Sequence, residues 1–471
     1  MAHIPKRTKN FQKILKIHVS LFPYTMNNDL QQTDILIIGG GWAGLSAAIK
    51  LVEYGQNVCL VESAKNLGGR AREISYHQYT VDNGTHIMVG AYTKTLSLMK
   101  KVSKNNWSES DLLERQPLNL NYKIKSKHEI NIPSTLLPTP FNLLFSFILT
   151  KGLTPAEKFK ILYLSVKIRL NLFPNKDDDK LGGFLKTNKQ NSKIITEIWE
   201  PLCLAIMNTP VNQASTEIFI KVFKDAFFKS RQASDLLFFK KTLSESFPEP
   251  AQQFIQEHNG RVYTNHKALS IKEDSGSYYV YTNKTNFKAK HIIIASTPNV
   301  TSNLLDSLSD SPKTKNLISK LQQFNYQPIC TVYIQYPEPI SCERTMQGFI
   351  GTTTQWMFNK ELIHKPGFIS VIISSQGSHM DMDNPALIKH ITCELAELYP
   401  HWPQYEDAFV IREKRATFTS SVNINRIRPS NKTAIPNIWL AGDYTNTQYP
   451  ATLEGAVRSG LQCAEQILLE N

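Results

Sequence analysis

The hydrophobic and polar positions near the start of the chain follow the pattern of a strand, a helix and a second strand. Residues 34–38 form a short apolar run that predicts a buried strand, and residues 57–61 predict another. Between them, residues 42–54 place apolar side chains at helical spacing. This order predicts a βαβ unit, in which the two strands lie parallel in one sheet.

The rest of the chain mixes strand and helix patterns and contains no internal repeats. A period of two, or a short apolar run, predicts strands in residues 260–290, 290–298, 326–335, 346–353 and 367–375. Residues 191–240 are predicted to be mainly helical and irregular, and residues 384–398 to form a helix. The βαβ start and the mixed remainder predict an α/β fold, a Rossmann-like domain interrupted by an inserted mixed α+β domain.

Three glycines join the first predicted strand to the helix, in the spacing Gly39-x-Gly41-x-x-Gly44. The first glycine allows a tight turn, the second lets phosphate oxygens approach the backbone, and the third lets helix and strand pack closely. The amide groups at the helix start then favour a pyrophosphate. Glu62 ends the second strand, where a carboxylate can accept hydrogen bonds from ribose hydroxyls. The unit therefore predicts a dinucleotide site, without separating NAD from FAD.

The segment from Leu60 to Arg72 resembles the second flavin motif of the amine oxidase and phytoene desaturase superfamily. In that family the turn corresponding to Gly69 and Arg70 places backbone and guanidinium against the cofactor phosphates, and a guanidinium matches phosphate oxygens well. The resemblance implies FAD, bound without a covalent link. It also implies that the backbone of Ala268 contacts the adenine.

Residues 438–460 have the pattern of a strand, an acidic turn and a helix start. Gly442 and Asp443 resemble the turn that binds the ribityl and phosphate part of FAD in this superfamily. The helix that starts near Thr452 and Leu453 would direct its N–H groups at the flavin and stabilise the reduced ring. We therefore expect a discontinuous FAD-binding domain (34–120, 241–300 and 425–471) and a substrate-binding domain (121–240 and 301–424).

Several segments narrow the resemblance to the squalene-associated flavoenzymes, the hydroxysqualene dehydroxylases. These segments are 81–92, 199–210, 233–237, 243–251 and 450–460, and the resemblance runs from about residue 34 to 469. It implies an FAD-dependent oxidoreductase of triterpene (squalene/hopanoid) biosynthesis that removes the hydroxyl of hydroxysqualene by hydride transfer from reduced flavin. The substrate would be a long apolar isoprenoid.

Two alternatives remain open at this stage. Residues 441–449 and the setting of His86 also resemble plant-type carotenoid desaturases, which remove hydride from an alkyl chain. A weaker alternative is a non-catalytic prenyl-binding chaperone of the same fold, which does not use flavin. The intact set of Glu62, Gly69, Arg70 and Asp443 disfavours this second alternative.

Removal of a hydroxyl needs a proton donor, because hydroxide is a poor leaving group. His86 is the catalytic candidate, since the resemblance places its segment near the flavin and an ordinary histidine titrates near neutrality. The alternative is a histidine that only orders its turn or touches the cofactor. Asn208 and Thr452 could bind the substrate hydroxyl, or could serve packing alone. The six cysteines and twelve histidines show no metal-ligand spacing, so we expect no metal.

The chain has 53 Lys and Arg against 40 Asp and Glu, a net charge of +13. This bias favours acidic partners, but no nucleic-acid motif accompanies it, so we expect no nucleic-acid partner. Residues 1–33 predict a flexible basic extension. A second nucleotide fingerprint for NAD(P)H is missing from the sequence, which leaves the electron donor of the flavin unknown.

Residues 136–173 combine an apolar run, too short to span a bilayer, with a segment that interleaves basic and bulky apolar residues. The second part begins with Thr154-Pro-Ala-Glu157, a capping box with proline at the first helical position. Such a segment can lie on an anionic membrane surface, or it can be a buried helix with a basic edge. We expect a cytoplasmic protein, with peripheral contact at the inner face of the cell membrane.

Overall fold

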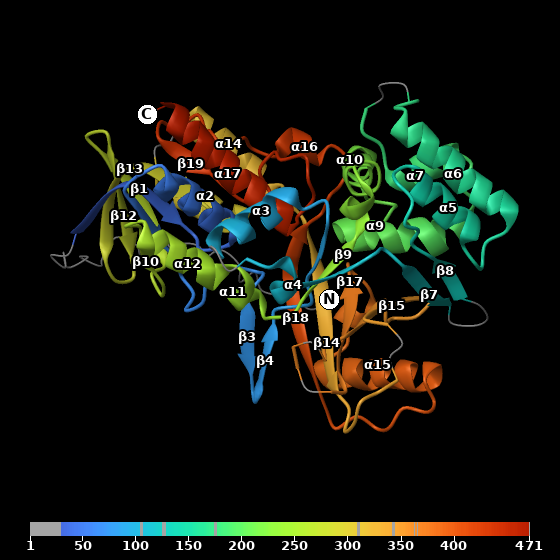
Figure 1. Cartoon of the computed structure of the whole chain (residues 1–471). Coiled ribbons are helices and arrows are strands. Elements are labelled where there is room, and N and C mark those ends of the chain that lie inside the picture. The colour runs from blue at the N-terminus through green and yellow to red at the C-terminus, as the bar shows by residue number, and fades with distance from the viewer. Residues whose placement is uncertain are drawn as a thin grey trace, which may run out of the picture.

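The computed structural model describes residues 30–103, 107–124, 129–173, 177–308, 311–341, 344–361, 363–364 and 366–470. The predicted basic extension therefore lies outside the described residues except for its last four positions, which begin strand β1. Figure 1 shows a sheet with helices at one side of the molecule, a helical part at the other, and a second sheet below them.

The first sheet has the order β10-β2-β1-β13-β12-β11, and β19 pairs with the far end of β13. Strands β10, β2, β1, β13 and β19 are parallel, while β11 and β12 are antiparallel. Ile38 faces both Val61 and Ile294, and Ile294 faces Leu440, so four strands end at one level. The strands are β1 (Leu30–Ile38), β2 (Val58–Val61), β10 (Arg261–Tyr263), β11 (Ala268–Asp274), β12 (Ser277–Thr282), β13 (Asn286–Ile294) and β19 (Ile438–Leu440).

These strands confirm the predicted βαβ unit and the predicted strands between residues 260 and 298. The helix of the unit, α2 (Trp42–Glu53), is buried on nearly every face, because it lies between the sheet and other helices. In doubly wound folds a ligand binds at the carboxyl ends of parallel strands. The shared level at which β1, β2, β13 and β19 end is therefore the expected edge.

Helix α17 (Leu453–Glu470) packs along α2, as Figure 1 shows. The contact is close: a Cβ on Gly460 would overlap the carbonyl oxygen of Ala43. Helices α3 (Thr93–Val102) and α12 (Pro248–Glu257) pack beside this pair. The last helix of the chain is thus held against the first helix of the cofactor unit.

The second sheet has the order β18-β14-β17-β16-β15-β7-β8, and α15 (Asn384–Leu398) covers one of its faces. The predicted strand at 346–353 is shorter than expected, because residues 351–353 turn back into β16. Strand β18 was not predicted from the sequence. The strands are β7 (Leu120–Ile124), β8 (Glu129–Ile132), β14 (Tyr326–Gln335), β15 (Met346–Ile350), β16 (Trp356–Asn359), β17 (Phe368–Ser374) and β18 (Asp407–Phe418).

The helical part contains α5 (Phe141–Leu149), α6 (Pro155–Arg169), α7 (Leu181–Thr187), α8 (Ser192–Ile194), α9 (Glu200–Met207) and α10 (Thr216–Phe227). The capping box of α6 is confirmed, because Glu157 N donates to Thr154 Oγ1 at 3.3 Å and Thr154 N donates to Glu157 Oε2 at 2.8 Å. In the described residues no helix is long and apolar enough to cross a bilayer.

One segment of the predicted helical region is a strand instead. β9 (Leu236–Phe239) pairs with β5 (Ile87–Val89) and β6 (Leu113–Gln116), which are distant in sequence. The limits predicted for the two domains stay a prediction. The other short elements are β3 (Glu73–Tyr76), β4 (Tyr79–Asp82), α4 (Glu109–Leu112), α11 (Leu243–Ser246), α13 (Pro298–Asp306), α14 (Pro312–Gln322) and α16 (Ile424–Ile427).

The contact between α2 and α17 predicts the effect of a single methyl group. Gly460→Ala would push the new Cβ into the carbonyl of Ala43, so we expect a loss of about 1–3 kcal/mol and a lower thermal unfolding midpoint. Gly183→Ala in α7 is the matched control, because its Cβ would have no neighbour within 4 Å. That control should leave the midpoint unchanged or raise it, and an equal fall in both variants would contradict the prediction.

Candidate active site

In the glycine turn between β1 and α2, the close packing of the protein itself requires glycine at positions 39 and 44. Gly39 has φ +116° and lies against the carbonyl of Ala295, and a Cβ on Gly44 would overlap the carbonyl of Gly39. Gly41 differs, since a Cβ there would meet only Gly69 Cα, at 3.9 Å. It is the N-cap of α2 and has an ordinary φ of −74°. The backbone therefore leaves open space before the helix N-terminus, which fits an approaching pyrophosphate.

Glu62 lies at the end of β2 and fastens the same turn. Its Oε2 accepts from Gly40 N at 2.7 Å, and its Oε1 accepts from Ala64 N at 2.7 Å. The carboxylate thus stands at the carboxyl edge of the sheet, where its predicted ribose contact requires it. The bond to Gly40 adds a second task, which is to hold the glycine turn in place.

The segment before Ala268 is tied to Glu62, because His266 N donates to the Glu62 carbonyl at 2.8 Å. Ala268 itself begins β11, is partly buried, and faces Thr282. The structure therefore brings the predicted adenine-contacting strand next to the predicted ribose carboxylate. The adenine contact itself stays a prediction.

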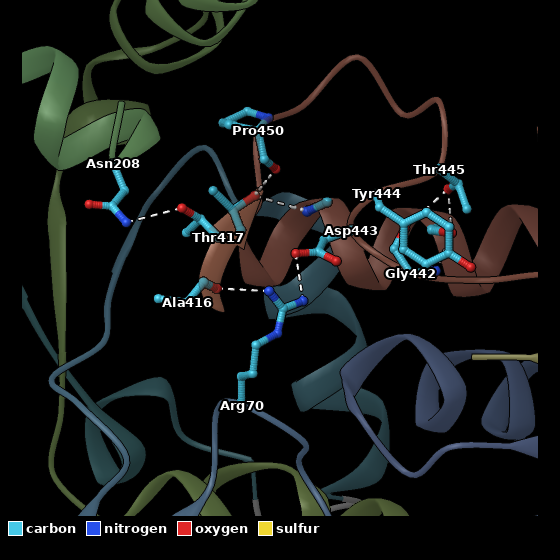
Figure 2. Close-up of polar contacts among 12 residues, drawn as sticks. Arg70, Asn208, Ala416, Thr417, Gly442, Asp443, Tyr444, Thr445 and Pro450 are labelled. Atoms are coloured by element: carbon cyan, nitrogen blue, oxygen red, sulfur yellow. Dashed lines mark hydrogen bonds and ion pairs between the residues drawn. The ribbon is translucent and has the colours of Figure 1, made fainter. Parts of the chain in front are cut away.

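The early and late flavin segments meet in an ion pair. Arg70 Nη2 donates to Asp443 Oδ2 at 2.7 Å, and Nη1 donates to the Ala416 carbonyl at 2.7 Å (Figure 2). The two residues are 373 positions apart in the chain. Desolvation lowers the pKa of Arg70, but the nearby carboxylates of Asp443 and Glu413 outweigh it and raise the pKa overall. The pair thus holds a permanent cation at the junction of the two segments.

The acidic turn after β19 has its own scaffold. Gly442 lies close to the Tyr444 ring and adopts φ +158°, and its N–H donates to Ser459 Oγ of α17 at 2.9 Å. Asn431 Nδ2 donates to Ser459 Oγ at 3.1 Å and to the Leu440 carbonyl at 2.8 Å. The turn is therefore fixed to both the preceding strand and the following helix.

Arg428 is a positioning residue that the sequence analysis missed. It is buried, and its guanidinium donates to the carbonyls of Asp443, Thr445 and Tyr449 and to Thr447 Oγ1. Burial lowers its pKa to about 10. The position belongs to no motif, and these four acceptors follow fifteen or more residues later, so local sequence could not have revealed its role.

Thr452 and Leu453 start α17 as predicted. Thr452 Oγ1 accepts from Gly455 N at 3.1 Å, which is the bond of an N-cap residue. Leu453 is the first helical residue and is buried. The Thr452 side-chain oxygen therefore already accepts a hydrogen bond within the protein. The N–H groups that precede Gly455 at this helix start are the ones suited to the predicted flavin contact.

Asn208 is employed in the protein as well. It ends α9 with φ 48°, and its Nδ2 donates to Thr417 Oγ1 at 3.0 Å (Figure 2) and to the Pro328 carbonyl at 3.2 Å. Its Oδ1 accepts from Ser375 N at 2.8 Å. These contacts join α9 to the second sheet, which is the packing role that the sequence left open beside a substrate contact.

His86 lies in the turn between β4 and β5, beside the Gly-Gly-Arg segment: Asn83 Nδ2 of this turn donates to the Arg70 carbonyl at 3.3 Å. The Nδ1 of His86 lies 3.0 Å from the Gly84 carbonyl. Burial lowers the pKa of His86 to about 4, and the positive charges of Lys360 and Arg70 act in the same direction. The imidazole is therefore neutral near pH 7, which contradicts the argument that its pKa suits proton delivery.

A small cavity next to His86 contains a buried lysine that the sequence analysis missed. Lys360 is 9% exposed, and burial lowers the pKa of its ammonium, while Asp82 opposes this effect. Burial raises the pKa of Asp82 to about 6, although Lys360 and the N–H of Leu243 favour its charged form. The cavity is lined by Thr85, His86, Phe238, Phe239, Thr345, Phe358, Asn359, Lys360 and Ile363.

A larger cavity lies in the helical part, between α5, α9, α10 and the edge of the second sheet, and is open to solvent at its mouth. Its wall is mostly apolar, and Arg231, Ser234 and Asp235 supply the polar groups at one side. Such a cavity fits a ligand that is mainly hydrocarbon. Its apolar lining includes Leu118, Leu120, Tyr122, Ile132, Leu143, Phe147, Ile198, Trp199, Leu202, Phe223 and Phe227.

Comparison with known proteins agrees with this geometry. Hydroxysqualene dehydroxylase of Zymomonas mobilis is 26% identical over 92% of this chain and 98% of its own length. Zeta-carotene desaturase of Synechocystis is 22% identical over 92% of this chain and 97% of its own. An oxidoreductase from Methanosarcina mazei has the same fold, with a TM-score of 0.73 at 15% identity, covering 92% of this chain and all of that one.

The model of one family matches almost the whole described chain, from residue 42 to residue 468. The match includes α2, the Gly-Gly-Arg segment, the acidic turn and α17, which are the elements that converge in the structure. The chain is an FAD-dependent oxidoreductase, and it belongs to the flavin-containing amine oxidoreductase family.

Proposed function

We propose that the chain removes the hydroxyl of hydroxysqualene reductively and releases squalene. The observation that carries the proposal is the apolar cavity of the helical part, because a cavity with this lining suits a long hydrocarbon better than a charged amine. The similarity to hydroxysqualene dehydroxylases over nearly the full length of both chains supports the same reaction.

The residues of this chain divide the work between holding the cofactor and serving the reacting carbon. Gly41 and the N-terminus of α2 receive the pyrophosphate, Glu62 the ribose, and Arg70 with the turn at Asp443 the phosphate and ribityl part. Reduced FAD, when bound, supplies a hydride. The protein would exclude water and would orient the allylic carbon toward the bound cofactor, whose hydride would replace the departing hydroxyl.

The departing hydroxide takes its electron pair with it and needs one proton to leave as water. The proposal assigns this proton to Lys360, since His86 is neutral at pH 7 and burial makes the Lys360 ammonium a stronger acid than in water. His86 lines the same small cavity as Lys360, and its Nδ1 lies 3.0 Å from the Gly84 carbonyl oxygen. The neutral amine left on Lys360 regains its proton from solvent before the next turnover.

A substitution at Gly41 tests cofactor binding without disturbing the fold. In Gly41→Ala the new methyl group meets nothing closer than 3.9 Å within the protein, but it occupies the space in front of the α2 N-terminus. We expect the apoprotein to unfold at the wild-type temperature and its bound-flavin absorbance to fall at least tenfold. Gly44→Ala is the comparison, because its methyl group overlaps protein backbone and should lower the unfolding temperature itself. Normal flavin content in Gly41→Ala would contradict this placement.

Lys360 and His86 can be separated by their effects on turnover. Lys360→Met should lower kcat for dehydroxylation by about 10²–10⁴ while bound flavin remains. In the wild type, kcat should fall as pH rises through the pKa of Lys360, because the ammonium form is required, and Lys360→Met should lack this fall. His86→Gln should lower kcat by less than tenfold.

Two further variants control this comparison. Lys414→Met removes an exposed lysine of β18 and should leave kcat unchanged. Lys360→Met combined with Asp82→Asn removes the carboxylate that would otherwise lose its cation, and it should unfold near the wild-type temperature. Wild-type kcat in this folded double variant would exclude Lys360 as the proton source.

An anaerobic experiment tests the reaction itself. The flavin of the purified holoprotein is reduced with dithionite, and hydroxysqualene is added; squalene should form in step with the return of the oxidised-flavin spectrum. The carotenoid desaturases among the relatives run electrons in the opposite direction, from substrate to flavin. Inertness toward hydroxysqualene, with turnover of phytoene or zeta-carotene by the oxidised form, would replace the proposal with desaturation.

A further inference from the structure

Exposed apolar side chains gather on one surface of the molecule. Within the described residues eighteen large hydrophobic side chains are exposed, and twelve of them lie between residues 136 and 172. Helices α5 and α6 carry most of them, at the edge of the molecule far from the first sheet (Figure 1). We call the twelve the α5–α6 surface: Leu136, Leu137, Phe141, Leu144, Phe145, Ile148, Leu149, Phe159, Tyr163, Val166, Leu170 and Leu172.

Helix α5 presents an apolar face to its exposed side and a mixed face to the large cavity. Phe141, Leu144, Phe145 and Ile148 follow the spacing of one helical face and are exposed. The other face carries residues that line the large cavity, namely Asn142, Leu143, Ser146 and Phe147. One nine-residue helix therefore separates the cavity from the α5–α6 surface.

The charges around this surface are almost all of one sign. Residues 136–173 contain five basic residues and a single acid, Glu157. Glu157 is buried, caps α6, and is paired with Lys193. The basic residues are Lys151, Lys158, Lys160, Lys167 and Arg169.

An apolar face with a cationic margin complements an anionic bilayer: buried apolar area and attraction to lipid phosphates act together there. Each basic residue near such a surface adds to the attraction. A second protein would need acidic groups arranged to match these charges, whereas a lipid surface supplies them everywhere. The observations therefore favour a lipid surface as the occupant.

We propose that the α5–α6 surface lies in the interface of an anionic bilayer and that the apolar substrate enters the large cavity from the lipid, past α5. This inference rests on the proposed function only for the identity of the substrate. The docking follows from the surface itself. The cavity wall formed by α5 then faces the phase in which a long isoprenoid dissolves.

Vesicle flotation of the FAD-loaded protein tests the docking without substrate. Wild type should float with vesicles that contain phosphatidylglycerol, and far less with pure phosphatidylcholine. Leu136→Ser combined with Phe159→Ser changes two of the most exposed side chains, 82% and 70% exposed, so the fold should persist. We expect this variant to bind at least tenfold more weakly, as should Lys151→Glu combined with Arg169→Glu.

The control variant makes the same kind of apolar-to-serine substitution outside the α5–α6 surface. Tyr54→Ser combined with Leu469→Ser removes two exposed apolar side chains, 58% and 87% exposed, outside the α5–α6 surface. It should float like the wild type. Failure of the wild type to float with anionic vesicles would overturn the proposal, and so would an equal loss in the control. A wild-type dimer that fails to float and that the Leu136→Ser, Phe159→Ser variant separates would identify a protein interface instead.

Substrate entry is tested with hydroxysqualene presented in two ways. In anionic vesicles the Leu136→Ser, Phe159→Ser variant should turn over at least tenfold more slowly than the wild type, and in detergent micelles at the wild-type rate. Equal rates in vesicles would overturn entry from the lipid. If no form of the protein converts hydroxysqualene but the wild type still floats, the proposed reaction fails while the docking stands.

Discussion

The close contact between α2 and α17 is the constraint on which the site depends. Because Gly460 lies against the backbone of Ala43, the middle of α17 is held against the first turn of α2, the helix that follows the glycine turn. The parallel register of β1, β13 and β19 brings the carboxyl ends of their strands to one level. The start of α2 and the acidic turn after β19 thus lie at the same edge of one sheet, where an extended dinucleotide can be held.

Two arginines hold the acidic turn that follows β19. Arg70 joins the early segment to Asp443, and Arg428 collects the carbonyls of residues 443–449 from within. A buried guanidinium is expensive unless its donors are satisfied, and here each arginine is surrounded by oxygen acceptors. The acidic turn therefore has a fixed shape before any cofactor contact is considered.

Low polarity around residues 82–86 decides which group can carry a proton. Burial disfavours a positive charge on His86, and two nearby cations disfavour it further, so the imidazole is neutral. Lys360 is also buried, but the carboxylate of Asp82 supports its charge.

Burial is incomplete for helix α5, in the helical part of the molecule. Its exposed face is apolar, and an apolar face needs apolar surroundings that the described part of the protein does not supply there.

The sequence by itself determined the elements whose evidence is local. The βαβ unit, the role of Gly44, the place of Glu62 and the capping box at Thr154 all follow from residues within one or two turns or strands of each other. Tertiary structure alone decided the rest. The pairing of Arg70 with Asp443, the task of Arg428, and the strand at 236–239 depend on partners far along the chain. The neutrality of His86 depends on burial and on Lys360, which no spacing reveals, because a pKa is set by everything packed around the group.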